Sequence, residues 1–357
     1  MNCPYLGDCL NQALKFDFME IDCIHFYVIN AAQIQDLLIR KMGLRDLGSN
    51  VTEGTIEYLV GNSQLSFSIS SPLNSTSPVA KYLQHHPSGV NNISFRVWNL
   101  DLIRRKLDRL GIKILATSVT EDELPWLKIQ GWGGIEHTIK QASSKLNTSI
   151  IDAHSLITGI DHLVLNVATG ELNAAATWYQ NLFNFQVQQT FDIQSQTSGL
   201  NSKALVSSCG KIRFNINEPS SINSQIQDFI DRNHGAGIQH IALQTSDIFR
   251  TIDRMRQQQL AFLEIDRTYY TQLQIRARTA QNSALTATEW HQLQNLQILA
   301  DWSESSPEAV LLQIFTQPIF EVPTFFFEVI ERRNRAKGFG RGNFQALFEA
   351  IEQNLAA

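Results

Sequence analysis

Two histidines and one glutamate are the residues whose types and settings in this sequence point to chemistry. His162 and His240 occupy the same place in two similar heptads, GIDHLVL (159–165) and GIQHIAL (237–243), and Glu328 is the single carboxylate in the aromatic run PTFFFEVI. Two imidazoles and one carboxylate can hold a divalent metal on one face and leave three positions open, a ligand set typical of non-haem Fe(II) oxygenases. The three residues therefore predict a metal centre.

Simpler interpretations of these residues stay open at this point. Either histidine could be a hydrogen-bonded core residue, although two histidines at one repeat position weaken that explanation for the pair. Glu328 could face solvent from a strand with one wet face. Strand alternation places it with Phe326 and Ile330, however, and an ionised carboxylate on an apolar face needs a partner or a proton. We therefore expect a buried Glu328 that has a partner.

The two heptads belong to a repeat that runs through the chain and must position these side chains. Weaker copies read DCIHFYV (22–28) and GVNNISF (89–95). Helical patterns follow the four copies, and short β-rich runs follow the helices. The expected helices cover 31–41, 100–110, 172–182 and 248–259, and the clearest strands after them cover 55–60, 65–70, 204–207 and 211–216.

A strand, a helix and further strands, repeated four times, predict an α+β fold of four βαβββ units. One such unit cannot bury its sheet face alone, so pairs of units should form two open, barrel-like domains. We expect an N-terminal domain at 18–145 and a C-terminal domain at 157–357, with a linker rich in Ser, Thr and Asn at 143–154. A Gln-rich helical insertion at 267–302 lengthens the fourth unit.

The end of the chain carries an amphipathic helical pattern. Apolar residues with i, i+3, i+4, i+7 spacing predict a C-terminal helix whose apolar face must pack on something, and we expect it to act as a lid. These residues are Phe344, Leu347, Phe348 and Ile351.

The two expected domains differ in the residues that could bind a metal. His25 matches His162, but Asn92 stands at the place of His240, and the match to Glu328 falls near 136–137, where no aromatic run is found. An amide oxygen is a poor iron ligand beside imidazole. We therefore expect a metal-free, non-catalytic N-terminal domain that supports the catalytic domain or provides a dimer contact.

The composition argues against several classes of function. The formal net charge is −5, and charged residues make up only 18%, whereas nucleic-acid binding needs clustered cations. The stretch RRNRAK (332–337) is short, and we expect it to be a solvated loop. The four cysteines have no Cys-x-x-Cys spacing, so neither a disulfide framework nor a zinc-thiolate site is expected. Without a signal-peptide pattern or a long apolar stretch, we expect a cytoplasmic protein with no membrane partner.

Longer segments around the candidate residues resemble the 4-hydroxyphenylpyruvate dioxygenase family, which has the vicinal oxygen chelate fold. The resemblance covers most of 157–355 and continues more loosely through the front half. It implies one Fe(II) per subunit with His162, His240 and Glu328 as ligands, and we expect a homodimer or homotetramer. The segments that carry the resemblance are GAGIQHIAL (235–243), LLQIFT (311–316), PTFFFEVI (323–330) and GFGRGNF (338–344).

The resemblance also implies a reaction and a set of pocket residues. The 2-oxo acid tail of 4-hydroxyphenylpyruvate would chelate the iron beside O2, and decarboxylation with ring hydroxylation would give homogentisate and CO2. Without the resemblance, Gln313 would be interpreted as a polar strand-edge residue and the phenylalanines as core. Positions that match catalytic polar residues of the family are Ser202, Asn217, Gln225 and Gln313, and positions that match substrate-binding residues are Phe326, Phe339, Asn343 and Phe344.

Departures from the family pattern keep alternatives open. Asn215 stands where the family usually has proline, and Val322 stands where it usually has arginine. A 4-hydroxymandelate synthase shares the fold, ligands and substrate, although Asn217 favours the ring-hydroxylating enzyme. A non-catalytic small-molecule-binding protein on the same scaffold is the alternative from another class. The sequence also leaves open whether homogentisate would serve tyrosine catabolism or prenylquinone synthesis.

Overall fold

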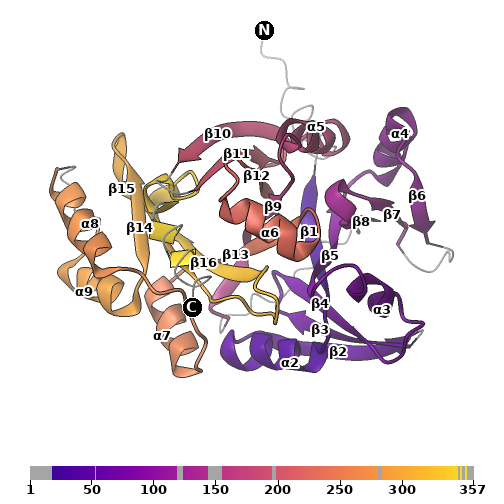
Figure 1. Ribbon diagram of the computed structural model, residues 1–357, viewed down its shortest axis with the longest axis horizontal. Helices are drawn as coiled ribbons and strands as arrows, with labels where there is room; N and C mark the ends of the chain where they lie inside the picture. The colour runs from indigo at the N-terminus through magenta and orange to yellow at the C-terminus, as the bar shows by residue number, and fades with distance from the viewer. Residues whose placement is uncertain are drawn as a thin grey trace, which may run out of the picture.

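The protein is built on two eight-stranded sheets, one from each half of the chain (Figure 1). Residues 144–154 of the expected linker and Phe348 lie outside the residues that the structure describes. The computed structural model describes residues 18–52, 54–118, 124–143, 155–194, 198–279, 284–344, 346–347 and 350–351.

The first sheet has the spatial order β2-β3-β4-β1-β5-β8-β7-β6. Its strands are β1 (Met19–Tyr27), β2 (Arg45–Thr52), β3 (Thr55–Gly61), β4 (Ser66–Pro72), β5 (Gly89–Val97), β6 (Ile114–Thr117), β7 (Trp126–Gln130) and β8 (Glu136–Gln141). The helical segments of this half are α2 (Ala31–Asp36) with a π-helical continuation (Leu37–Lys41), α3 (Pro78–Leu83), α4 (Leu100–Leu110) and a 3-10 turn (Trp132–Gly134).

The second sheet has the spatial order β10-β11-β12-β9-β13-β16-β15-β14. Its strands are β9 (Ile157–Asn166), β10 (Gln186–Gln194), β11 (Gly199–Val206), β12 (Arg213–Pro219), β13 (Gly237–Thr245), β14 (Leu299–Ser303), β15 (Ser306–Phe315) and β16 (Phe326–Arg332). The helical segments are α5 (Leu172–Phe183), α6 (Gln225–Asn233), α7 (Ile248–Gln257), α8 (Arg267–Thr279), α9 (Ala287–Leu296) and two 3-10 turns (Arg333–Arg335, Arg341–Asn343).

The two sheets repeat one topology, which confirms the predicted α+β fold of four units. In each sheet the first strands of its two units pair antiparallel at the centre, β1 with β5 and β9 with β13. Each of these four strands also pairs in parallel with the last strand of its own unit. These parallel pairs are β1 with β4, β5 with β8, β9 with β12 and β13 with β16. The four predicted helices are all present, whereas the short helices α3 and α6 were not predicted.

Local sequence explains where several helices begin and end. Asn99 and Asp247 precede α4 and α7 at matching places, and each side chain accepts a hydrogen bond from the backbone N–H three residues further on. Gly111, in the left-handed conformation, ends α4. In the predicted insertion, Thr286 and Glu289 form a capping box at the start of α9. The insertion is therefore helical, as its sequence pattern indicated.

An aromatic layer joins the back of β16 to the first sheet. The ring centroid of Phe327 lies 5.8 Å from that of Phe67, and Phe325 lies 5.2 Å from Phe26. Because alternate residues of a strand face opposite sides, Glu328 points away from this layer and into the second sheet. The first half thus covers the strand that carries Glu328, and both faces of that strand are buried.

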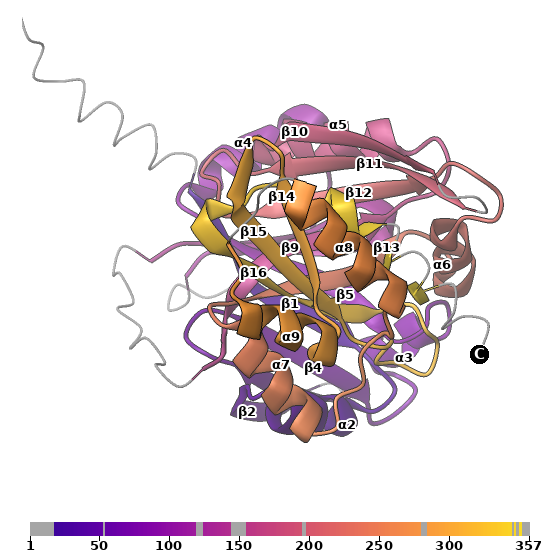
Figure 2. The same ribbon diagram turned by 90° about the vertical axis from the view of Figure 1, so that its left-hand side faces the viewer.

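Two later segments cover the second sheet. Figure 2 shows α8 in front of this sheet, where Tyr269 and Arg276 bond to Ala300 and Asp301 of β14. Residues 344, 346–347 and 350–351 are helical, in agreement with the predicted C-terminal helix as far as it is described. Across the described ranges, no helix combines the length and apolar character needed to cross a membrane.

Candidate metal centre and pocket

His162, His240 and Glu328 meet inside the second sheet, on the neighbouring strands β9, β13 and β16. Oε2 of Glu328 lies 3.2 Å from Nε2 of His162 and 3.6 Å from Nε2 of His240. One ligand atom from each residue lies within 4.8 Å of the other two, and all three side chains are buried. Strand register explains the meeting, because Ala242 of β13 pairs with both His162 and Glu328. The structure brings the three predicted ligands together.

Each histidine is held through its other ring nitrogen. Nδ1 of His162 donates to Oδ1 of Asp161 at 2.9 Å, and Nδ1 of His240 lies 3.4 Å from Oε1 of Gln239. The ring of Phe326 stacks on His240 with centroids 4.8 Å apart. A hydrogen bond at Nδ1 selects the tautomer whose Nε2 is free to act as a ligand. Both histidines can therefore present Nε2 to a shared ion.

Glu328 is fixed by a chain of hydrogen bonds that ends in the insertion. Nε2 of Gln313 donates to Oε1 of Glu328 at 2.8 Å, and Oε1 of Gln313 accepts from Nδ2 of Asn343 at 2.8 Å. The hydroxyl of Tyr269 donates to Oδ1 of Asn343 at 2.8 Å. Since Gln313 occupies Oε1, Oε2 of Glu328 remains on the side of the histidines.

The electrostatics of these three side chains also point to a cation. Burial opposes protonation of His162, but the charges of Glu328 and Asp161 outweigh it and raise the pKa of His162 to about 9. Burial, helped by the charge on His162, lowers the pKa of His240 well below its usual value. Glu328 is thus paired with one protonated imidazole and one neutral imidazole. A divalent ion in place of that proton would satisfy all three groups, so the donor set fits a metal.

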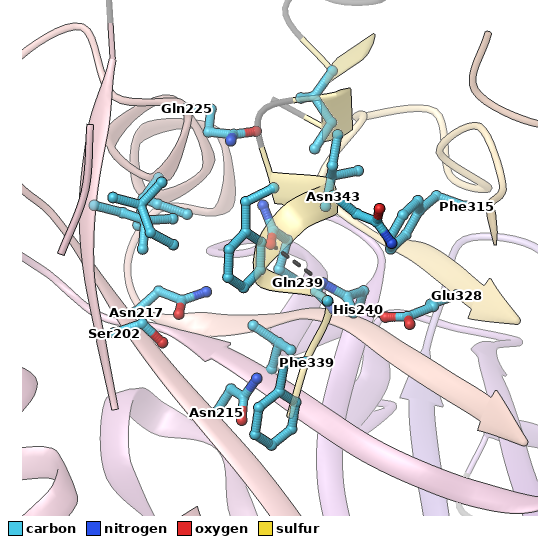
Figure 3. Close-up of a pocket in the computed structure, with 18 of the residues that line it drawn as sticks. Ser202, Asn215, Asn217, Gln225, Gln239, His240, Phe315, Glu328, Phe339 and Asn343 are labelled. Carbon is cyan, nitrogen blue, oxygen red and sulfur yellow. Dashed lines mark hydrogen bonds and ion pairs between the residues drawn. The ribbon is translucent and has the colours of Figure 1, made fainter. Parts of the chain in front are cut away.

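A pocket opens beside the three ligands (Figure 3). Figure 3 shows Asn217 and Ser202 on the same wall, where their strands pair them directly. Apolar side chains, among them Val164 and Phe315, complete the wall. The predicted residues that line this pocket are His162, Ser202, Asn217, Gln225, His240, Gln313, Glu328, Phe339, Asn343 and Phe344.

Two buried oxygens in the pocket wall have no hydrogen-bond partner among the residues that the structure describes. They are Oε1 of Gln225 and Oδ1 of Asn215. The amide of Asn217, in contrast, donates to Oδ1 of Asn166 at 3.2 Å. A buried acceptor without a partner is unfavourable, which indicates that a ligand or a water donates to it. The pocket is therefore prepared for a molecule that carries hydrogen-bond donors.

Two residues lie elsewhere than expected, and three residues near the site were not predicted. Phe326 lies outside the wall of this pocket and faces an adjoining cavity, because its ring stacks behind His240. Arg332 was expected in a solvated loop, but its side chain is only 8% exposed because it pairs with Asp161. Asp161 and Gln239 were not predicted, although each directly precedes a candidate ligand in the sequence. Tyr269 has no sequence pattern that would reveal it.

The corresponding place in the first sheet holds a different set of residues. Ser94 pairs with Thr138 as Ala242 pairs with Glu328, so Thr138 matches Glu328, just past the expected position. Strand register determines this match, and register was not readable from the sequence around 136–137. Nδ2 of Asn92 donates to Oγ1 of Thr138 at 2.9 Å, and Nε2 of His25 lies 2.7 Å from Oγ of Ser70. Asn92 and Thr138 thus form one hydrogen-bonded pair, and His25 and Ser70 form another.

Comparisons with known proteins find a matching superfamily and several relatives of this chain. Residues 159–283 match the Glyoxalase/Bleomycin resistance protein/Dioxygenase superfamily. The chain is 39% identical over 334 residues to an uncharacterized protein of Synechocystis sp. This alignment covers 94% of this chain and 97% of that protein. It is 34% identical over 283 residues to a 4-hydroxyphenylpyruvate dioxygenase of Pseudomonas aeruginosa, and this alignment covers 76% of each chain.

A solved structure shares the whole architecture. A mutant of 4-hydroxymandelate synthase from Streptomyces coelicolor superimposes with a TM-score of 0.81 at 23% sequence identity. The match covers 94% of this chain and 98% of that one. At this level of identity the likeness bears on the fold, which is the same two-sheet arrangement.

Proposed function

The chain belongs to the 4-hydroxyphenylpyruvate dioxygenase family, and on that basis we propose that it is an Fe(II)-dependent enzyme that converts 4-hydroxyphenylpyruvate and O2 to homogentisate and CO2. One observation carries the proposal: His162, His240 and Glu328 converge, buried, beside a pocket with aromatic and amide walls. In this proposal residues 157–357 form the catalytic domain, and residues 18–145 form a non-catalytic domain that supports β16 from behind.

The three ligand residues would hold Fe(II) on one face of the site. Imidazole and carboxylate suit this ion, and the bound iron would supply the coordination of a 2-oxo acid and the activation of O2. The contribution of the chain is to fix the donors. Asp161 orients His162, Gln239 lies against His240, and Gln313 occupies the second oxygen of Glu328.

The pocket residues would orient the aromatic end of the substrate. Phe339 and Phe344 supply ring faces for an aromatic ring. A phenol hydroxyl is a hydrogen-bond donor, and Oε1 of Gln225 is a buried acceptor with no donor among the described residues. Ser202 and Asn217 line the same pocket and can complete the polar contacts. Oδ1 of Asn215 adds an acceptor where the resemblance led us to expect proline.

The C-terminal segment would close the pocket. Phe344, Leu347 and Ile351 line it and pack beside the other apolar walls. A closed apolar wall excludes water, which strengthens the electrostatic contacts inside the site. In this proposal the C-terminal segment is therefore the lid of the pocket. The proposal also includes a cytoplasmic location and assembly as a homodimer or homotetramer.

Iron content and product identity test the proposal. We expect wild-type protein to hold one iron per subunit and to form homogentisate from 4-hydroxyphenylpyruvate. Glu328→Ala should lose iron and turnover while the fold is retained. Glu308→Ala, which changes an exposed glutamate, is the matched control and should behave as wild type. Iron is measured by elemental analysis, and the product by chromatography with mass detection.

Two results would contradict the proposal in different ways. Formation of 4-hydroxymandelate without homogentisate would show an iron enzyme that oxidises a different carbon. A wild-type protein that binds no iron, together with equal uptake of 4-hydroxyphenylpyruvate by wild type and Glu328→Ala, would indicate a binding protein. Retained turnover in His162→Ala or His240→Ala would contradict the ligand assignment itself.

A further inference from the structure

Asp161 lies between a candidate metal ligand and a buried arginine. Its Oδ1 accepts from Nδ1 of His162 at 2.9 Å and from Nη2 of Arg332 at 2.7 Å. Its Oδ2 accepts from Nε of Arg332 at 2.7 Å. The side chain of Asp161 is 1% exposed and that of Arg332 is 8% exposed. The guanidinium therefore grips the carboxylate with two parallel hydrogen bonds, away from solvent.

These two hydrogen bonds determine how the carboxylate of Asp161 is oriented toward His162. A carboxylate with one free rotation could present either oxygen to the imidazole, whereas the planar fork of Arg332 fixes the plane of the carboxylate. The fixed carboxylate holds the proton of His162 on Nδ1, so that Nε2 faces Glu328. A second arginine, Arg213, is also near Asp161, but at 3.7 Å and with a side chain that is 35% exposed.

The remaining nitrogen of Arg332 reaches the loop that follows β16. Nη1 donates to the backbone oxygen of Gly338 at 2.8 Å and to that of Ala336 at 3.2 Å. The next residue in the loop is Phe339, whose ring lies edge-on to His162 with centroids 5.2 Å apart. One guanidinium thus contacts both the residue that orients His162 and the backbone that places Phe339 against it.

We propose that Arg332 is a positioning residue that couples the orientation of His162 to the placement of the pocket loop Ala336–Gly340. The inference rests on the proposed function only in treating His162 as a metal ligand. Removing the fork should weaken metal binding and release the loop at the same time. Arg213, which contacts Asp161 but none of these loop oxygens, should have neither effect.

The experiment compares Arg332→Met and Arg332→Lys with Arg213→Met in the full chain. Co(II) is titrated into metal-free protein and followed by absorbance. We expect Arg332→Met to weaken Co(II) binding by about 10- to 100-fold, the range for residues behind a metal ligand. Arg332→Lys keeps the charge without the fork and should be intermediate, and Arg213→Met should stay within about twofold of wild type, since it lies outside that fork.

Limited proteolysis reads the loop independently of the metal. Trypsin should cut the metal-free Arg332→Met protein in this segment several times faster than wild type, and Arg213→Met at the wild-type rate. Circular dichroism verifies the fold, and if Arg332→Met does not fold, Arg332→Lys provides the comparison. Cleavage is compared at the sites that wild type and all variants share, because Arg332→Met removes the site at 332; these are Arg333, Arg335, Lys337 and Arg341.

The outcomes separate this inference from the proposed function. Equal Co(II) affinity in the Arg332 and Arg213 variants would overturn it, and weaker Co(II) binding with unchanged cleavage would overturn the coupling. Wild-type protein that binds no Co(II) would instead contradict the metal centre. In that case faster cleavage of the Arg332 variants would still support the contact with the loop, and unchanged cleavage would refute that contact as well.

Discussion

The amide Nε2 of Gln313 donates to Oε1 of Glu328 at 2.8 Å, and this bond separates the two oxygens of the carboxylate. Oε1 is occupied by the amide, and Oε2 lies within 3.6 Å of both histidines. A carboxylate held in this way offers one oxygen to an ion and cannot rotate without breaking a buried hydrogen bond. Gln313 therefore determines which oxygen of Glu328 would be offered to a metal ion.

Replacing Gln313 by leucine should weaken metal binding without unfolding the protein. Leucine fills similar space but leaves Oε1 of Glu328 without its donor. We expect the dissociation constant for Fe(II) or Co(II) to rise by about 10- to 100-fold. Titration of metal-free protein measures it. Gln317→Leu, the same change at an exposed position just beyond β15, is the control, and an equal effect in both variants would contradict the role of Gln313.

Replacing Tyr269 by phenylalanine tests the far end of the same chain of hydrogen bonds. The change leaves Oδ1 of Asn343 and the N–H of Ala300 without partners. We expect the free energy of unfolding to fall by about 1–3 kcal/mol and metal affinity to fall with it. Tyr270→Phe is a close control, because it removes a buried hydroxyl that has no hydrogen-bond partner in the described part of the chain, and it should leave stability unchanged or raised. Urea unfolding of the two variants gives the comparison.

Replacing Gly340 by alanine should disturb Gln313 directly. A Cβ at Gly340 would lie 1.9 Å from Oε1 of Gln313, whereas a Cβ at Gly210, in the turn between β11 and β12, would meet nothing within 4 Å. Both glycines have positive φ, so alanine should cost about 1–2 kcal/mol of stability at either position. Only Gly340→Ala should also reduce turnover and metal affinity, by about tenfold or more. Equal activity of the two variants would refute this contact.

The convergence of His162, His240 and Glu328 was predictable because strand alternation and repetition act locally. Alternation placed Glu328 on the face opposite Phe327, and the repeat placed His162 and His240 on equivalent strands. Both inferences needed only the period of a strand and the similarity of two heptads. The fold followed from the same patterns, since four similar units leave few ways to bury their sheets.

The residues that orient the ligands were not predictable in the same way. Arg332 lies in a run of cations that is typical of a solvated loop, and its burial depends on Asp161, a partner far away in sequence. Tyr269 lies in an inserted helix whose position against β14 depends on tertiary packing. Thr138 was missed because its match to Glu328 is set by strand register. Contacts between distant segments decide these positions, and no local pattern records them.

His137 makes the contact between the two halves sensitive to pH. Its Nε2 lies 3.1 Å from the hydroxyl of Tyr179 in the second half, and its Nδ1 lies 3.4 Å from the backbone oxygen of Ile93. Aromatic rings of Phe95, Trp178 and Phe183 surround it. Complete burial lowers the pKa of His137 from 6.5 to about 4. The folded protein therefore keeps this imidazole neutral.

Acidification from pH 7.5 to pH 4 should consequently destabilise the wild-type protein through His137. Below pH 6.5 the unfolded chain binds a proton at His137, whereas the folded chain does not bind it until about pH 4. The free energy of unfolding therefore falls between these two pH values. The total contribution is about 3 kcal/mol, at 1.4 kcal/mol per tenfold change in proton affinity. His137→Gln cannot titrate, so its stability should fall less over this range, while exposed His291→Gln should follow wild type. Urea unfolding across this pH range tests it, and parallel profiles for wild type and His137→Gln would contradict a neutral buried His137.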